Sequence, residues 1–251
     1  MTSRNYNHKF EKKERSVSHY KYKSTFNKRS VSKFYFITDQ IVAPILDQGT
    51  LGSCVANAAH SLFYILSNQQ INLSRLHLYY ISRAIDGSSS TEDTGTYVST
   101  ALHSLFKYGL ANENLWEYDI DNFSVLSPSV CFNETYTLKN YSYKVVLQNI
   151  EDLTNCLSEG NPIIIGMLVY SSFESNDINK TGLIPMPNTK KESLLGGHCL
   201  LIIGYDLESK YFKVQNSWGS NWGSSGYCFI PFDYILDPDL TIELFTVTFS
   251  I

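Results

Sequence analysis

Residues 48–66 read QGTLGSCVANAAHSLFYIL, a loop with two glycines followed by an apolar helical pattern. Apolar side chains recur there at three- and four-residue spacing, which predicts a helix over 53–67. Cys54 stands at its start, where backbone N–H groups lack partners within the helix and favour a negative charge. A lone cysteine is more commonly a small buried apolar side chain. This placement, however, lowers the pKa of a thiol and predicts a nucleophile.

His198 is the histidine best placed to serve that thiol. It opens an apolar strand directly after Gly196 and Gly197, so no side chain crowds the ring at the strand end. The other histidines belong to the N-terminal segment or to predicted helices, where an ordinary polar side chain is the simpler interpretation: His8, His19, His60, His77 and His103. We therefore expect a Cys54–His198 pair.

Three segments occur in a fixed order along the chain: QGTLGSC at 48–54, GGHCLLIIGYD at 196–206 and QNSWGSNWGSSGY at 215–227. The first places a glutamine six residues before the cysteine. In order and spacing the three resemble the active-site motifs of the papain family of cysteine proteases, in its compact microbial or viral form. A single such motif is weak evidence, but three in the correct order are specific.

The resemblance implies a role for each matching residue. Cys54 matches the nucleophile that attacks the peptide carbonyl, and His198 matches the base, later the acid, that holds it in a thiolate–imidazolium pair. Asn216 matches the residue that orients the imidazole. Gln48 matches the donor that, with the Cys54 backbone N–H, stabilises the oxyanion.

The resemblance also implies substrate-binding positions. Gly95 matches the edge that pairs with the substrate backbone as an added strand, and Trp218 matches the indole on the leaving-group side. A main specificity pocket is expected near Gly95, Gly166, Gly196 and Cys199, with an apolar side chain accepted. The full set of expected substrate-binding residues is Thr94, Gly95, Gly166, Gly197, Cys199 and Trp218.

The pattern of the chain predicts an α+β fold. Further helices are expected over 74–85, 97–108 and 150–158, and strands over 143–148, 162–170, 198–205, 211–215, 227–231 and 244–249. The resemblance implies a papain-like fold with two lobes and the active-site cleft between them. The helical left lobe is expected at about 41–137 and an antiparallel, barrel-like right lobe at about 138–251.

Composition restricts the chemistry and the compartment. The five cysteines form no Cys-x-x-Cys pair, which argues against a zinc site and a disulfide framework. Leu51 stands where many papain-family members have a disulfide cysteine, which fits a reducing compartment. We expect no metal and no cofactor. With no signal peptide and no apolar run of membrane-spanning length, we expect a cytoplasmic or virion-associated protein.

Residues 1–33 form a basic arm ahead of an acidic peptidase domain at 34–251. The arm holds ten of the 20 Lys and Arg residues and two of the 24 acidic residues, so it carries +8 against −12 for the remainder. We expect an endopeptidase made as a zymogen, with the arm as its intramolecular inhibitor and peptides or proteins as substrates. Three alternatives stay open. The first is that the arm is a solvated tail. The second is an amidase or acyl-transferase that uses the same thiol, and the third is an inert body beside an arm that binds nucleic acid or another polyanion.

Overall fold

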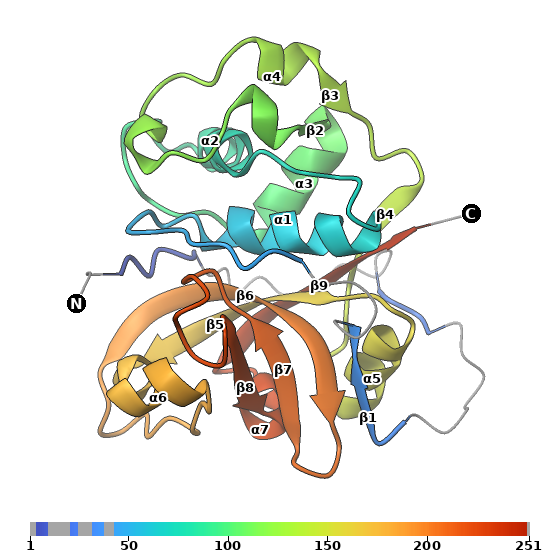
Figure 1. Ribbon diagram of the computed structural model, residues 1–251, viewed down its shortest axis with the longest axis vertical. Coiled ribbons are helices and arrows are strands. Elements are labelled where there is room, and N and C mark those ends of the chain that lie inside the picture. Colours follow the sequence, from blue (N-terminus) through green and yellow to red (C-terminus); the bar gives the residue numbers. More distant parts are fainter. Residues whose placement is uncertain (1–3, 10–20, 25–31, 38–42, 250–251) are drawn as a thin grey trace.

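The computed structural model describes residues 4–9, 21–24, 32–37 and 43–249. Figure 1 shows a helical half above a sheet half, with the N-terminal segment passing between them. The helices are α1 Cys54–Leu66, α2 Arg75–Ile85, α3 Val98–Tyr108, α4 Val130–Asn133, α5 Ile150–Ser158, α6 Asn176–Thr181 and α7 Phe232–Leu236. The strands are β1 Phe34–Phe36, β2 Leu110–Ala111, β3 Thr135–Tyr136, β4 Tyr141–Val145, β5 Ile163–Tyr170, β6 Leu194–Asp206, β7 Tyr211–Gln215, β8 Tyr227–Pro231 and β9 Thr241–Phe249.

Helix α1 is the central element of the structure. Nearly all of its side chains are buried, the polar Asn57, His60 and Ser61 among them. It contacts α2 and α3 on one side and β6 on the other. Because α1 lies where the two halves meet, its first residue, Cys54, is fixed at the boundary between them.

The main sheet is antiparallel and runs in the order β4-β9-β5-β6-β7-β8. The path begins at β4 and ends at β8, so the described residues form an open sheet rather than a closed barrel. Strand β6 is the longest and pairs with β5 and β7. The α+β, two-lobed expectation is confirmed, whereas the right lobe is barrel-like only in the loose sense of a curved sheet.

Strand β1 joins the end of the arm to the sheet. It pairs antiparallel with β6 in the register Phe34↔Asp206 to Phe36↔Gly204. The boundary expected between residues 33 and 34 therefore falls at the first residue of a sheet strand.

Most predicted elements agree with the structure. The helix at 150–158 and the strands at 211–215 and 227–231 have the expected bounds. The prediction for 143–148 was displaced, because pairing with β9 runs from Tyr141 to Val145. Strand β6 begins four residues earlier than predicted, since Leu194 pairs with Tyr170 of β5. None of the helices in the described ranges has both the length and the apolar character to span a membrane.

Candidate active site

Cys54 is the first residue of α1 and is fully buried. The turn before it depends on Gly49, whose φ of +62° suits glycine. In the first turn of α1, the side-chain amide of Asn57 donates to the Ser53 carbonyl at 3.0 Å. The loop and the helix thus hold the thiol at a helix N-terminus.

His198 lies on β6 and is also fully buried. Its Nε2 is 2.9 Å from Oδ1 of Asn216. The indole of Trp218 stacks on the imidazole, with ring centroids 4.7 Å apart and an interplanar angle of 22°. Within the described part of the chain, Nδ1 of His198 makes no hydrogen bond. The ring is therefore held by one nitrogen and one face.

Gln48 connects the loop that precedes Cys54 to the segment that contains Asn216 and Ser217. Its Nε2 donates to the Leu51 carbonyl at 2.9 Å, and its Oε1 accepts from the Ser217 hydroxyl at 2.6 Å. The backbone repeats the connection, since the Gln48 N–H donates to the Ser217 carbonyl at 2.9 Å. The side chain is buried and fixed, and its amide retains a second hydrogen to donate.

Residues 4–9 of the arm, which we call the cleft segment, lie in the groove between the two halves. The His8 N–H donates to the Gly197 carbonyl at 3.2 Å, on the sheet side. The Lys9 N–H donates to the Thr96 carbonyl at 3.4 Å, and Asn7 Nδ2 donates to the Asp93 carbonyl at 2.6 Å, both on the helical side. In Figure 1 this segment is the blue trace between the halves.

The cleft segment also covers the imidazole. The Tyr6 ring lies edge-on to His198 and to Trp218, with centroids 6.1 and 5.9 Å away, and its hydroxyl bonds to Glu174. The Arg4 guanidinium carbon lies 3.9 Å from the centroid of the Trp218 ring. Access to His198 along this side of the groove is therefore occupied by the chain's own residues.

Two glycines allow the segment to approach this closely. A Cβ at Gly95 would lie 1.5 Å from the Asn7 carbonyl oxygen, and a Cβ at Gly196 would lie 2.5 Å from that of Tyr6. Both glycines have positive φ, at +67° and +143°. A side chain at either position would exclude a backbone from the groove.

A papain-family cysteine protease model matches residues 30–234, which include every residue of the site described above outside the arm. The chain belongs to the papain family of cysteine proteases. An uncharacterised peptidase C1-like protein of Acanthamoeba polyphaga mimivirus is 34% identical over 215 residues, covering 80% of this chain and 68% of that protein. A viral cathepsin of Cydia pomonella granulosis virus is 30% identical over 196 residues, covering 74% and 53%. This papain-family chain thus spans between about half and two thirds of the length of these curated relatives.

A solved structure supports the papain-family assignment at the level of the whole chain. Xylellain, a cysteine protease from Xylella fastidiosa, superposes with a TM-score of 0.85 and 27% sequence identity. The superposition covers 99% of this chain and 97% of xylellain.

The expected substrate-binding residues of this family member divide into two groups. Gly95, Gly166, Gly197 and Trp218 contact the cleft segment. Thr94 bonds instead to the neighbouring Gly95 carbonyl, and Cys199 is buried in β6 opposite Gly166. The two groups are close in space, since Thr94 adjoins Gly95 and Cys199 pairs with Gly166.

Burial dominates the protonation of the two reactive groups. It raises the pKa of the Cys54 thiol to about 12, against hydrogen bonding from the Cys199 and Val55 backbones. It lowers the pKa of His198 to about 4, against the bond to Asn216 and with some help from the nearby charges of His8 and Arg4. Both shifts favour the neutral thiol and the neutral imidazole over the expected thiolate–imidazolium pair in this buried arrangement.

Sequence reasoning missed two acidic residues of the site. Asp93 accepts from the Gly52 N–H at 3.0 Å and from the Tyr79 hydroxyl, so a carboxylate links the cysteine loop to the Gly95 loop. Glu243 lies on β9 at the base of the pocket beside Gly166, which was expected to accept an apolar side chain. Its only sequence signal is a single acidic residue within the apolar stretch TIELFTVTF at 241–249.

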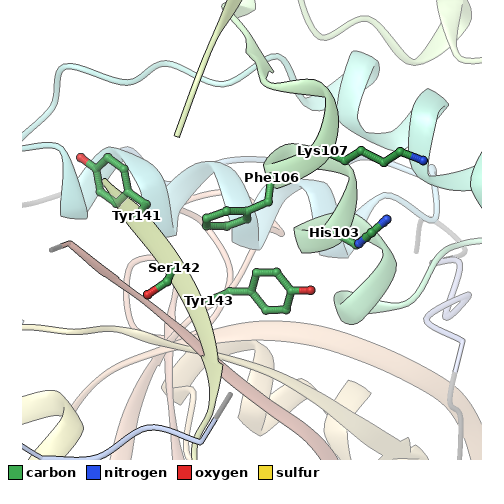
Figure 2. Close-up of a pocket in the computed structure, with 6 residues that line it drawn as sticks. All are labelled: His103, Phe106, Lys107, Tyr141, Ser142 and Tyr143. Carbon is green, nitrogen blue, oxygen red and sulfur yellow. The ribbon is translucent and has the colours of Figure 1, made fainter. Parts of the chain in front are cut away.

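A further pocket of the described chain lies on its surface, away from the cleft segment. A surface pocket between α3 and β4 is lined by His103, Phe106, Lys107, Tyr141, Ser142 and Tyr143 (Figure 2). It contains none of the expected catalytic residues. In the described ranges, no cluster of three or more His, Cys, Asp or Glu side chains could hold a metal ion.

Proposed function

We propose that Cys54, His198, Asn216 and Gln48 are the catalytic residues of a cysteine endopeptidase. The proposal rests on one observation: of the two ring nitrogens of His198, Nε2 faces Asn216 and Nδ1 makes no hydrogen bond within the described part of the chain. Because Nε2 faces the Asn216 Oδ1, which only accepts, the proton of the neutral ring belongs on Nε2. Nδ1 then carries the lone pair and is available as a base for the Cys54 thiol.

The chemistry proceeds in balanced steps. Nδ1 of His198 takes the proton from Cys54 Sγ, and the sulfur attacks the peptide carbonyl carbon to form a tetrahedral oxyanion. The imidazolium returns that proton to the leaving nitrogen as the C–N bond breaks, which leaves a thioester on Cys54. A water molecule, deprotonated by Nδ1, attacks the thioester, and the sulfur leaves and recovers its proton.

Two donors suit the oxyanion. The Cys54 N–H is at the start of α1, where no carbonyl within the helix accepts it. The second hydrogen of the fixed Gln48 amide is the other donor. One such donor is typically worth about 3 kcal/mol of transition-state stabilisation.

We further propose that the protein is made as a zymogen, with the arm at 1–33 as inhibitor of the peptidase domain at 34–251. The contacts of the cleft segment with both sides of the groove support this proposal, as does the covering of His198 by Tyr6. A second anchor lies at residues 21–24. There the Tyr22 N–H donates to the Val145 carbonyl at 2.8 Å, and Ser24 Oγ donates to Glu159 at 2.7 Å.

The same contacts favour peptide hydrolysis over the alternatives. A groove that bonds to backbone N–H groups suits an extended peptide better than the small amide of an amidase. Lys9 donates to Ser88 at 2.9 Å and Arg4 stacks on Trp218, so these two basic residues of the arm bind the body itself rather than an outside polyanion.

The test is cleavage of a pooled fluorogenic peptide library. We expect slow cleavage by the full chain, faster cleavage by a chain that begins at Lys33, and none by either chain carrying Cys54→Ala. Retained turnover after Cys54→Ala would refute the catalytic assignment. Equal turnover by the two parent chains, with both folded by circular dichroism, would refute inhibition by the arm.

A further inference from the structure

The pocket beside Gly166 holds the side chain of His8. That side chain is 0% exposed, and its Nε2 lies 2.9 Å from Oε2 of Glu243, which is 10% exposed. Its Nδ1 lies 3.0 Å from the Thr96 carbonyl oxygen. The imidazole thus spans the pocket between two oxygen atoms.

Both oxygen atoms act as acceptors. A backbone carbonyl has no hydrogen to donate, and neither has an ionised carboxylate. The arrangement around His8 is therefore suited to a side chain that donates and carries positive charge.

Other elements hold the Glu243 carboxylate in place. Its oxygens face the backbone N–H groups of Val98 and Ser99 at 3.4 and 3.3 Å, in the first turn of α3. The N-terminus of an 11-residue helix favours an anion. Glu243 is thus a positioned charge at the base of the pocket rather than a side chain free to turn into solvent.

The absence of a side chain at Gly166 provides the space. In the sheet Gly166 lies opposite Glu243, and a Cβ added there would lie 2.1 Å from His8 Nε2. Any larger residue would separate the occupant of the pocket from the carboxylate. The open volume and the charge therefore come from paired positions on β5 and β9.

We propose that this pocket is a cation-selective subsite in which Glu243 determines specificity, so that the enzyme prefers peptides that place a Lys, Arg or His side chain there. The inference rests on the proposed function, because it requires substrates to lie in the groove that residues 4–9 occupy. It differs from the apolar specificity expected from the resemblance, and the second experiment below decides between the two. It also explains why residue 8 of the arm is a histidine, since His8 occupies the pocket as a substrate side chain would.

The first experiment uses the full chain and needs no turnover. The measured quantity is the rate at which iodoacetamide alkylates Cys54, followed by mass spectrometry of its peptide, which reports how often the cleft segment leaves the groove. Loss of one partner from a largely buried ion pair supports an effect of at least about 10- to 100-fold. We expect His8→Leu to raise the rate by that factor and His8→Lys to change it by less than about threefold, since the lysine retains the charge.

The control is the same pair of arm variants in a Glu243→Gln chain. Glutamine keeps an oxygen for the Val98 and Ser99 N–H groups but carries no charge, and thermal melts check that each chain is folded. We expect His8→Leu to have little effect in this background. An equal effect of His8→Leu in both backgrounds, or none in the parent, would overturn the inference.

The second experiment measures cleavage by a full chain whose arm is weakened by Tyr6→Ala. A fluorogenic library is varied at each of the three positions before the cleaved bond. We expect one position to prefer Lys, Arg and His over Leu by about tenfold or more, and Glu243→Gln to abolish that preference. Cleavage with an apolar preference at every position overturns the subsite. If nothing is cleaved while the alkylation rates still depend on Glu243, the proposed function fails, and Glu243 keeps only its role in holding the cationic side chain of the arm.

Discussion

Tyr6→Ala in the full chain tests the proposed inhibition by the arm. Tyr6 packs edge-on against His198 and Trp218, and its hydroxyl bonds to Glu174. Alanine removes all three contacts from the cleft segment and leaves the catalytic residues intact. The closed form therefore loses stability relative to the open form, and activity rises with the open fraction.

The magnitude follows from those contacts. An aromatic pair contributes about 0.5 to 1.5 kcal/mol, and a hydrogen bond to a charged group about 1.5 to 3 kcal/mol. Because Tyr6 is only half-buried, the lower values apply, giving about 2.5 kcal/mol for two ring contacts and one hydrogen bond. At about 1.4 kcal/mol per factor of ten, the open fraction should increase about 50- to 100-fold while the closed form dominates.

The assay is the initial rate of fluorogenic-peptide hydrolysis at substrate concentrations well below KM. Tyr6→Phe loses only the hydroxyl bond and should raise the rate about tenfold. Lys23→Ala is the matched control, because Lys23 is in the arm and exposed, and should change nothing. Rates for Tyr6→Ala within about twofold of the parent would contradict the argument, since a ring that stabilises the closed form cannot be removed without cost.

Three further outcomes are expected. Asp93→Ala leaves the Gly52 N–H and the Tyr79 hydroxyl without their acceptor, so the free energy of unfolding in urea should fall by about 2 to 4 kcal/mol. A loss below about 1 kcal/mol would contradict this role. In the full chain the raised pKa of Cys54 keeps the thiol protonated, so the thiolate absorbance near about 240 nm, taken as the difference between the parent and Cys54→Ala, should stay near zero from about pH 5 to 9; a step in that range would refute the neutral pair. Asn216→Ala frees the imidazole of His198 to rotate, so kcat should fall about 10- to 100-fold with little change in KM; a change confined to KM would assign Asn216 to binding instead.

Local patterns accounted for a large part of the fold. The apolar spacing after residue 53 predicted α1, and the Ser74 hydroxyl, 3.3 Å from the His77 N–H, caps the next helix as its residue type suggested. Strand bounds were less certain, because pairing with a distant partner decides them. The displacement of β4 comes from β9, almost 100 residues away in sequence.

The sequence by itself determined the family and the order of its reactive residues. Motif spacing is a local property, and it places Cys54 at a helix start and His198 at a glycine-flanked strand. The tertiary structure alone decided what surrounds them. Whether Glu243 faces a pocket depends on its register against Gly166, and the raised pKa of the Cys54 thiol depends on how the folded chain buries it. The orientation of Glu243 and the burial of Cys54 both depend on contacts between segments far apart in the chain, so no short stretch of sequence reveals either.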